Sequence, residues 1–205
     1  MANVIFDFDG TIADSFELAI QIFEQVVRAG KPLPTEEIER LRGMSLIHVA
    51  IELRIRPWKV PFLLSRGRKM MRQRIDSVKV FEGMPELIRS LQVDGHKLYI
   101  VSSNSVQNIR PLLKKHELRT EFIRMYGGAG LLGKANMLRR VLKKQKLVPG
   151  DTYYVGDETR DIEAAKLAGI KIISVAWGYN NESILRDHKP DFLAIKPTDI
   201  RTALK

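Results

Sequence analysis

The chain has 205 residues, of which 44% are hydrophobic and 28% are charged, a composition typical of one globular domain or of one domain with a modest insertion. It contains no cysteine, which excludes disulfides, zinc–thiolate sites, iron–sulfur clusters and a thiol nucleophile, and its four histidines lack the close spacing of a helical metal site. The net charge of +10 leans toward residues 16–80, which hold 13 Lys and Arg against 7 Asp and Glu, and it favours anionic partners without choosing among them.

The N-terminal residues Met1–Asp7 carry no basic region and no long apolar segment, so they do not resemble a secretory signal. Apolar runs such as Leu98–Val101 are too short to span a bilayer. We therefore expect a cytoplasmic protein without a membrane segment.

The first part of the chain predicts one strand followed by a long helical segment. Ala2–Phe8 is an apolar run with little alternation, which is typical of a buried strand. From Phe16 to Val27 the apolar residues recur at helical spacing, and glycines and prolines then punctuate further helical stretches up to about Ser77. No strand is convincing between residues 16 and 78, so we interpret residues 16–80 as a helical insertion.

The remaining chain alternates between helices and strands. Its predicted strands are 97–101, 122–125, 152–155 and 171–175; its predicted helices are 85–94, 104–116, 134–146 and 158–168. This alternation predicts an α/β fold with a Rossmann-like parallel sheet, formed by residues 1–15 and 81–205, and with a small helical domain inserted after the first strand.

Polar residues follow the predicted strands, where ligands bind in such sheets. They are Asp7, Asp9, Gly10 and Thr11, then Ser102, Ser103 and Asn104, then Lys134, and finally Asp157 and Asp161. Clustered carboxylates repel one another, and an all-oxygen set suits Mg²⁺, which prefers to share phosphate oxygens with its protein ligands. An aspartate can attack phosphorus, a second carboxyl group can protonate the leaving oxygen, and a lysine and a hydroxyl can hold the phosphoryl oxygens.

Four short motifs in the expected order resemble those of the haloacid dehalogenase-like phosphohydrolases. They are Asp7-Phe8-Asp9-Gly10-Thr11, Ser102 after its strand, Lys134, and Gly156-Asp157-Glu158-Thr159-Arg160-Asp161. The resemblance covers the whole chain and implies that Asp7 is the nucleophile and that Asp9 is the general acid and base. It further implies that Asp7, Asp157 and the backbone carbonyl of Asp9 ligate Mg²⁺, that Ser102 and Lys134 contact the phosphoryl group, and that Asp161 supports the site. The acid at position 9 favours phosphate-ester chemistry over dehalogenation.

The insertion matches the family's helical cap, which closes over the site and contacts the leaving group. Arg42-Gly43 resembles a cap loop of the phosphoglycolate phosphatase branch, so Arg42 is a candidate for binding an anionic leaving group, with a surface role as the alternative. Gly10, Thr11, Ser103 and Asn104 are further candidates for binding phosphate. We expect a small phosphorylated metabolite as substrate, with phosphoglycolate as the simplest choice and with sugar phosphates and nucleotides still open. Nucleic acid is disfavoured because the basic residues show little aromatic interleaving; a monomer and a homodimer both remain open.

Three alternatives stay open from the sequence. A phosphomutase would use the same aspartyl-phosphate, and a binding protein could retain the same residues. Gly128–Lys134 also satisfies a phosphate-binding P-loop up to its last position, which would indicate a nucleoside triphosphatase, but Ala135 lacks the hydroxyl that binds Mg²⁺.

Several neighbouring residues have simpler interpretations. Asp14 and Ser15 are predicted to cap the first helix of the insertion. Glu158 and Arg160 could either orient the metal loop or lie on the surface, and Trp177–Tyr179 are expected mainly to pack.

Overall fold

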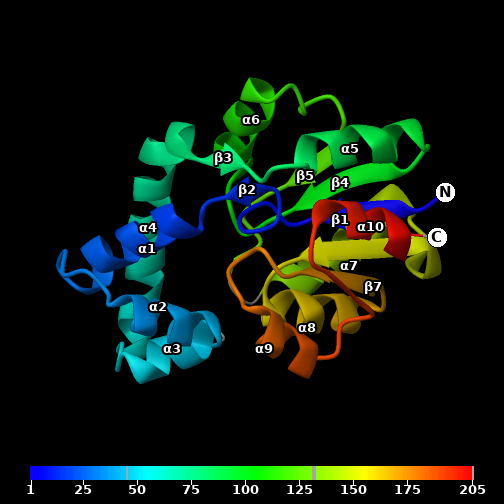
Figure 1. The fold of residues 1–205 in the computed structure, drawn as a ribbon. Coiled ribbons are helices and arrows are strands. Elements are labelled where there is room, and N and C mark those ends of the chain that lie inside the picture. The colour runs from blue at the N-terminus through cyan, green and yellow to red at the C-terminus, as the bar shows by residue number, and fades with distance from the viewer. Residues whose placement is uncertain (45, 131–132, 205) are drawn as a thin grey trace.

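The centre of the molecule is a parallel sheet with the strand order β5-β4-β1-β6-β7-β8, seen in the computed structural model in Figure 1, which describes residues 1–44, 46–130 and 133–204. The strands are β1 (Asn3–Phe6), β4 (Lys97–Val101), β5 (Arg124–Tyr126), β6 (Thr152–Gly156), β7 (Lys171–Val175) and β8 (Phe192–Ala194). Strand β1 lies between β4 and β6, with Val4 opposite Leu98 and Tyr153. The chain thus winds outward from a central first strand in both directions, which confirms the predicted Rossmann-like α/β fold.

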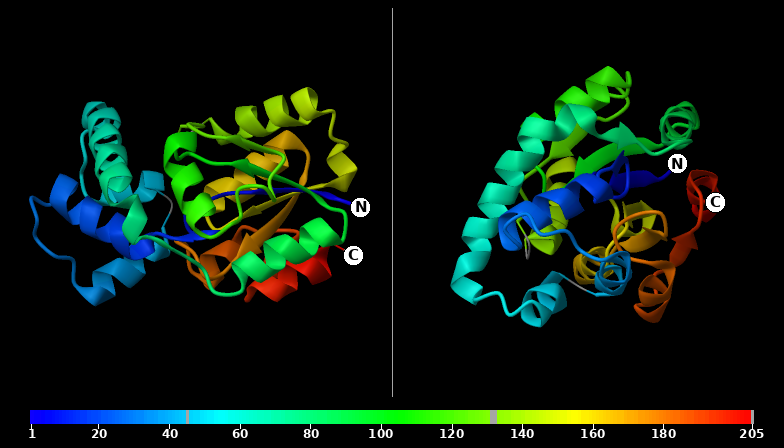
Figure 2. Two further views of the ribbon diagram at one scale, coloured as in Figure 1. Left: turned by 90° about the horizontal axis from the view of Figure 1, so that it is seen from above. Right: turned by 60° about the vertical axis from the view of Figure 1, so that its left-hand side comes forward.

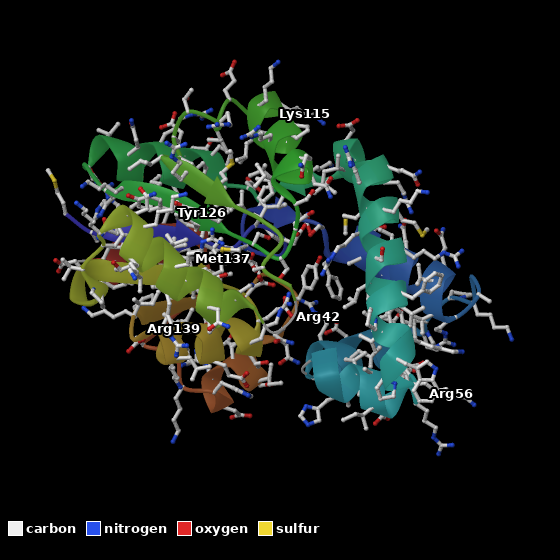
Figure 3. The ribbon with its side chains drawn as sticks, turned by 180° about the vertical axis from the view of Figure 1, so that it is seen from behind. Arg42, Arg56, Lys115, Tyr126, Met137 and Arg139 are labelled. Carbon is white, nitrogen blue, oxygen red and sulfur yellow. The ribbon has the colours of Figure 1, made fainter. Side chains whose placement is uncertain are left out.

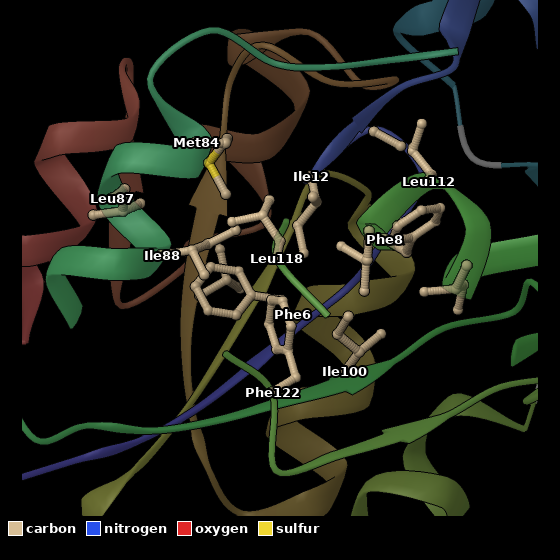
Figure 4. Close-up of a cluster of buried hydrophobic side chains, with 14 of the residues drawn as sticks. Phe6, Phe8, Ile12, Met84, Leu87, Ile88, Ile100, Leu112, Leu118 and Phe122 are labelled. Carbon is tan, nitrogen blue, oxygen red and sulfur yellow. The ribbon is translucent and has the colours of Figure 1, made fainter. Parts of the chain in front are cut away.

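Helices cover both faces of this sheet. Side chains point alternately to the two faces along each buried strand, so each strand packs against helices on both sides. Val4 and Phe6 point into a cluster with α5 (Met84–Val93), α6 (Val106–Lys115) and α10 (Pro197–Ala203), part of which is shown in Figure 4. Ile5 points to the opposite face, where α7 (Lys134–Gln145), α8 (Thr159–Ala168) and α9 (Glu182–Asp187) lie. Burial on both faces explains why the strands read as continuous apolar runs.

The described part of residues 16–80, the segment that we call the helical insertion, is mainly a group of helices beyond one end of the sheet (Figures 1 and 2). It contains α1 (Phe16–Val27), α2 (Thr35–Arg42), α3 (Leu46–Glu52), η1 (Pro57–Lys59), α4 (Val60–Arg74) and η2 (Ile75–Ser77), with α1 packed along α4. The chain leaves and re-enters the core through two short antiparallel strands, β2 (Ala13–Asp14) and β3 (Lys79–Val80). The predicted division into a core and a cap domain, with boundaries at residues 15 and 81, stays a prediction.

The structure differs from the predicted elements in its shortest strands. Strand β8 and the pair β2–β3 were not predicted, since two or three residues are too few to show a period of two. The predicted strand 122–125 begins two residues later, at Arg124. A further turn of 3-10 helix, η3 (Pro149–Asp151), precedes β6. Among the described helices, none has both the length and the apolar character needed to cross a membrane.

Candidate active site

Three acidic side chains meet at the carboxyl ends of the central strands, where the strand order of the sheet changes direction. Asp7 follows β1 and Asp157 follows the neighbouring strand β6, so the parallel pairing brings them to the same edge, and Asp161 lies in the first turn of α8. One carboxylate oxygen from each of the three lies within 4.8 Å of the others, and all three residues are buried. Ligands bind in α/β sheets at this reversal point, so its polar side chains are the candidate active site.

Lys134 neutralises part of this negative charge. It is the first residue of α7, its side chain is 3% exposed, and its Nζ lies 2.6 Å from Asp7 Oδ2 and 2.5 Å from Asp161 Oδ1. Burial lowers the pKa of Lys134, but the carboxylates of Asp161 and Asp7 more than offset this effect and raise the pKa above its ordinary value. Burial raises the pKa of Asp7 above its ordinary value, and the ammonium of Lys134 reduces this increase without cancelling it. Lys134 therefore stays charged and fixes the Asp7 carboxylate.

Asp161 is held in place by its own helix. Its Oδ2 accepts hydrogen bonds from the backbone N–H groups of Asp157 and Glu158, both at 3.1 Å, while its Oδ1 receives Lys134. An acidic side chain in the first turn of a helix is stabilised by the unpaired N–H groups there. Both oxygens are thus occupied by donors, which suits Asp161 to a supporting role.

Asp9 lies between the core and the helical insertion. Its Oδ2 accepts a hydrogen bond from Asn104 Nδ2 at 2.9 Å, and its Oδ1 accepts one from Ser15 Oγ at 3.1 Å. Burial, and next the charge of Asp7, raise the pKa of Asp9 to about 6, although the hydrogen bonds from Asn104 and Ser15 lower it. A carboxyl group with this pKa can give up and take back a proton near neutral pH.

The residues after β4 form a second polar edge of the site. Ser102 is buried, and its Oγ accepts a hydrogen bond from the backbone N–H of Asn104 at 3.1 Å. Ser103 is half-buried and contacts Arg160 at 3.4 Å. Asn104 Oδ1 accepts from the N–H of Ser105 and from Asn108 Nδ2, both at 2.8 Å, so the Asn104 side chain is oriented toward Asp9 from both ends.

Asp157 is enclosed by backbone that only glycine allows. A Cβ atom on Gly10, whose φ is +76°, would lie 2.1 Å from Asp157 Oδ2, and one on Gly178 would lie 2.3 Å from Asp157 Cβ. Thr11 Oγ1 donates to Asp157 Oδ1 at 2.8 Å, so its hydroxyl orients the carboxylate. Binding of phosphate by Gly10 and Thr11 stays a prediction.

Tyr179 belongs to the site although the sequence favoured a packing role for it. Its backbone N–H donates to Asp157 Oδ2 at 2.8 Å, and its hydroxyl lies 3.0 Å from Ser15 Oγ. Its ring also packs edge-on against Phe16 of the insertion, with ring centres 5.5 Å apart. The available signal was its position after the predicted strand 171–175, the one strand of the sequence-based prediction whose end the four motifs do not include.

The capping prediction for Ser15 holds for its N-cap position but not for its side chain. Ser15 occupies the residue before α1, but its side chain makes no hydrogen bond to the helix and instead contacts Asp9 and Tyr179. Glu158 is buried and pairs with Arg160, so these two residues stiffen the loop after β6 rather than lie on the surface.

Arg42 lies at the junction of the insertion and the core (Figure 3). Its Nη2 donates to the carbonyl of Gly178 at 2.8 Å, its Nε donates to the carbonyl of Tyr179 at 3.3 Å, and its guanidinium lies 4.7 Å from the centre of the Phe16 ring. Asn180 reinforces the junction by donating to the carbonyls of Arg42 and Met44. The predicted contact of Arg42 with an anionic leaving group stays a prediction.

The charges at the rim suit a divalent cation. Two basic side chains, Lys134 and Arg160, face five acidic ones: Asp7, Asp9, Asp157, Glu158 and Asp161. Burial, followed by the charges of Glu158, Asp161 and Asp7, raises the pKa of Asp157 well above its ordinary value. Such an all-oxygen, uncompensated set fits Mg²⁺, whose charge would offset the repulsion.

Comparison with known proteins agrees with this geometry. Residues 4–175 match the haloacid dehalogenase-like hydrolase family. The chain belongs to this family. It is 32% identical over 206 residues to a phosphoglycolate phosphatase from Synechococcus elongatus, covering 100% of the chain and 97% of that protein, which confirms the predicted branch.

Two further relatives span equally much of the chain. A 5'-nucleotidase from Pseudomonas aeruginosa is 25% identical, covering 99% of the chain and 95% of its own length. A haloacid dehalogenase-like hydrolase from Streptococcus pneumoniae is 21% identical and superposes with a TM-score of 0.80, covering 100% of the chain and 99% of that structure. The family membership removes the P-loop alternative, and Lys134 contacts two aspartates rather than ending a phosphate loop; Leu131 and Leu132 of that loop lie outside the described residues.

Proposed function

We propose that this protein is a Mg²⁺-dependent phosphatase that hydrolyses a small phosphomonoester through an aspartyl-phosphate on Asp7. The class of enzyme, a phosphatase, follows from the family and from the relative at 32% identity. The observation that supports the mechanism is the pairing of two different aspartates: Asp7, held by Lys134 at 2.6 Å, and Asp9, whose pKa is about 6. The ammonium of Lys134 favours the ionised form of Asp7 that a nucleophile needs, whereas Asp9, which accepts hydrogen bonds from Asn104 and Ser15, is suited to carry a proton.

The proposed first step forms a bond between an Asp7 carboxylate oxygen and phosphorus and breaks the bond from phosphorus to the ester oxygen. Asp9 donates its proton to that oxygen, so the alcohol leaves neutral. Lys134 and Ser102 hold phosphoryl oxygens while their charge is redistributed. Asp7, Asp157 and the backbone carbonyl of Asp9 would hold Mg²⁺, which supplies positive charge at the phosphoryl oxygens.

In the proposed second step, Asp9 is a carboxylate and removes a proton from water. The water oxygen bonds to phosphorus, and the bond from phosphorus to the Asp7 oxygen breaks. Inorganic phosphate is released, and the carboxylate of Asp7 is restored. Asn104 and Ser15 orient the Asp9 carboxyl group in both steps. A phosphomutase would require groups that bind the hydroxyls of a sugar, and the largely apolar cavity beside Asp9 favours hydrolysis instead.

The test is release of phosphate from 4-nitrophenyl phosphate, measured with Mg²⁺ and with EDTA. We expect EDTA to abolish turnover and Asp7→Asn to lower kcat at least about a thousandfold, because no nucleophile remains. Asp14→Asn, which changes an exposed aspartate, is the matched control and should keep wild-type activity. Substantial turnover by Asp7→Asn, or turnover that is insensitive to EDTA, would contradict the proposal.

A further inference from the structure

A cavity of about 520 Å³ lies between the helical insertion and the candidate active site. Its core side is polar and includes Asp9, Ser103, Asn104 and Arg160. Its insertion side is lined by aliphatic and aromatic side chains from three helices, α1, α3 and α4: Ile22, Phe23, Val49, Leu63, Leu64 and Met71. The proton donor of the proposed mechanism thus stands at the boundary between a polar and an apolar half.

The insertion contributes little positive charge to the lining of this cavity. Among the described residues that line the cavity, Arg68 is the one charged side chain that the insertion contributes, and Arg68 is itself exposed to solvent. Arg66, Lys69 and Arg72 on the same helix are exposed and lie outside the lining. The basic residues Arg66, Lys69 and Arg72 of α4 therefore face solvent outside the space that a leaving group would occupy.

Arg42 is also absent from the lining of the cavity. Two of its nitrogen atoms are bound to the carbonyls of Gly178 and Tyr179, and a third lies 3.3 Å from Glu39 Oε1. A carboxylate in the apolar half would therefore lose its hydration, and among the described lining residues the insertion offers it only the solvent-exposed Arg68 as a cation.

The cavity is also large for a leaving group as small as glycolate. Pockets that bind small molecules have volumes of about 300–1,000 Å³ and use mainly apolar walls with a few oriented polar groups. Here the polar groups lie on the core side of the cavity, where the phosphate would bind, and the remaining wall consists mainly of apolar side chains. Apolar surface that leaves water on binding supplies affinity in such a volume, whereas sugar hydroxyls would remain unsatisfied.

We propose that the substrate of this site is a phosphomonoester of an apolar alcohol, with an aryl or branched alkyl group that occupies the cavity, and that phosphoglycolate is a poor substrate. This inference rests on the proposed function, because it assigns the group that leaves when Asp7 attacks phosphorus. It assigns the specificity to the apolar side chains of α1, α3 and α4.

The test compares kcat/KM for 2-phenylethyl phosphate with that for phosphoglycolate. Both are esters of primary alcohols, so the comparison reports mainly on what the leaving group contacts. We expect the wild-type protein to prefer 2-phenylethyl phosphate at least tenfold, because matching one apolar group to an apolar pocket is worth about ten- to two-hundredfold. A preference for phosphoglycolate, or equal values, would overturn the inference and leave the proposed phosphatase intact.

A variant of the lining provides the second arm. Leu64→Asn introduces an amide of similar size into the apolar half and should lower the ratio of the two kcat/KM values about tenfold. The matched control is Leu167→Asn, the same substitution at a leucine of α8 that is 62% exposed and outside the cavity; it should leave the ratio unchanged. Equal ratios for the two variants would overturn the assignment of the cavity.

Inhibition of the wild-type protein gives an arm that does not depend on folding of a variant. In 3-phenylpropylphosphonate and 3-phosphonopropionate a methylene replaces the ester oxygen of the two substrates. We expect the apolar phosphonate to bind at least tenfold more tightly, and equal inhibition constants would overturn the inference. If the wild-type protein hydrolyses none of the three compounds (2-phenylethyl phosphate, phosphoglycolate and 4-nitrophenyl phosphate), the proposed function is overturned, and the inference with it.

Discussion

At the carboxyl end of the sheet, acidic and basic side chains are packed together below the surface, whereas in the helical insertion most of the charged side chains are exposed and the wall of the cavity is apolar. The first region fixes its groups with short contacts, such as Lys134 to Asp7 at 2.6 Å and Asp161 to the N–H groups of Asp157 and Glu158. The second region holds an open volume of about 520 Å³. Under the proposed function, this difference corresponds to a division of roles, in which the core orients the reacting groups and the insertion selects the leaving group.

The largest effect should follow from removing the buried ammonium group of Lys134 from the core region. Lys134→Met leaves the buried carboxylates of Asp7 and Asp161 without their partner, so we expect the free energy of unfolding to fall by about 3–5 kcal/mol. Urea denaturation measures this loss. The matched control is Lys144→Met, at an exposed position of the same helix, which should change stability by less than about 0.5 kcal/mol. A similar cost for both variants would show that the buried charges are not held by Lys134.

The next effect concerns Asp9, where the two regions meet. The pKa of about 6 means that the protonated form needed by a general acid falls tenfold with each pH unit above 6, so kcat/KM for an alkyl phosphate should fall with rising pH. Asn104→Ala removes a hydrogen bond that lowers this pKa, and the fall should therefore begin at a higher pH than in the wild-type protein.

The comparison between variant and wild type cancels the titration of the substrate itself. Asn136→Ala, at an exposed asparagine of α7, is the control and should leave the profile in place. A profile that does not move in Asn104→Ala would remove Asn104 from its role in orienting Asp9.

The smallest effect concerns the junction between the two regions. Arg42→Lys cannot donate to both the Gly178 and Tyr179 carbonyls in the same geometry, so we expect a loss of about 1 kcal/mol in stability, measured by denaturation. The kcat/KM values for 2-phenylethyl phosphate and phosphoglycolate should change by the same factor. A selective loss for phosphoglycolate alone would restore the interpretation of Arg42 as a receptor for the carboxylate.

Much of the fold could be predicted because the buried strands are apolar on both faces and are separated by amphipathic helices. Asp7, Ser102 and Asp157 could be placed together from the sequence alone, since the carboxyl ends of neighbouring parallel strands meet at one edge of the sheet. Strand β8 was missed because its three residues carry no periodic signal.

The contacts that orient the site could not be predicted in the same way. Ser15 stands in a typical capping position, and only the geometry after β2 turns its hydroxyl toward Asp9. The roles of Tyr179 and Asn180 arise partly from backbone groups, which carry no signature in the side-chain sequence. The apolar half of the cavity escaped prediction because apolar helical spacing is the same for a packed interior and for a binding pocket.

The short antiparallel pairing of β2 with β3 has a consequence for how the protein could evolve. Ala13 lies opposite Val80 and Asp14 opposite Lys79, so the insertion begins and ends at adjacent points of the backbone, about 5 Å apart as in any paired strands. A segment whose ends are adjacent can be exchanged for another of different length while the two flanking residues stay in place. The same catalytic edge could thus acquire new substrates by replacement of one continuous piece of sequence, without revision of the residues that perform the chemistry.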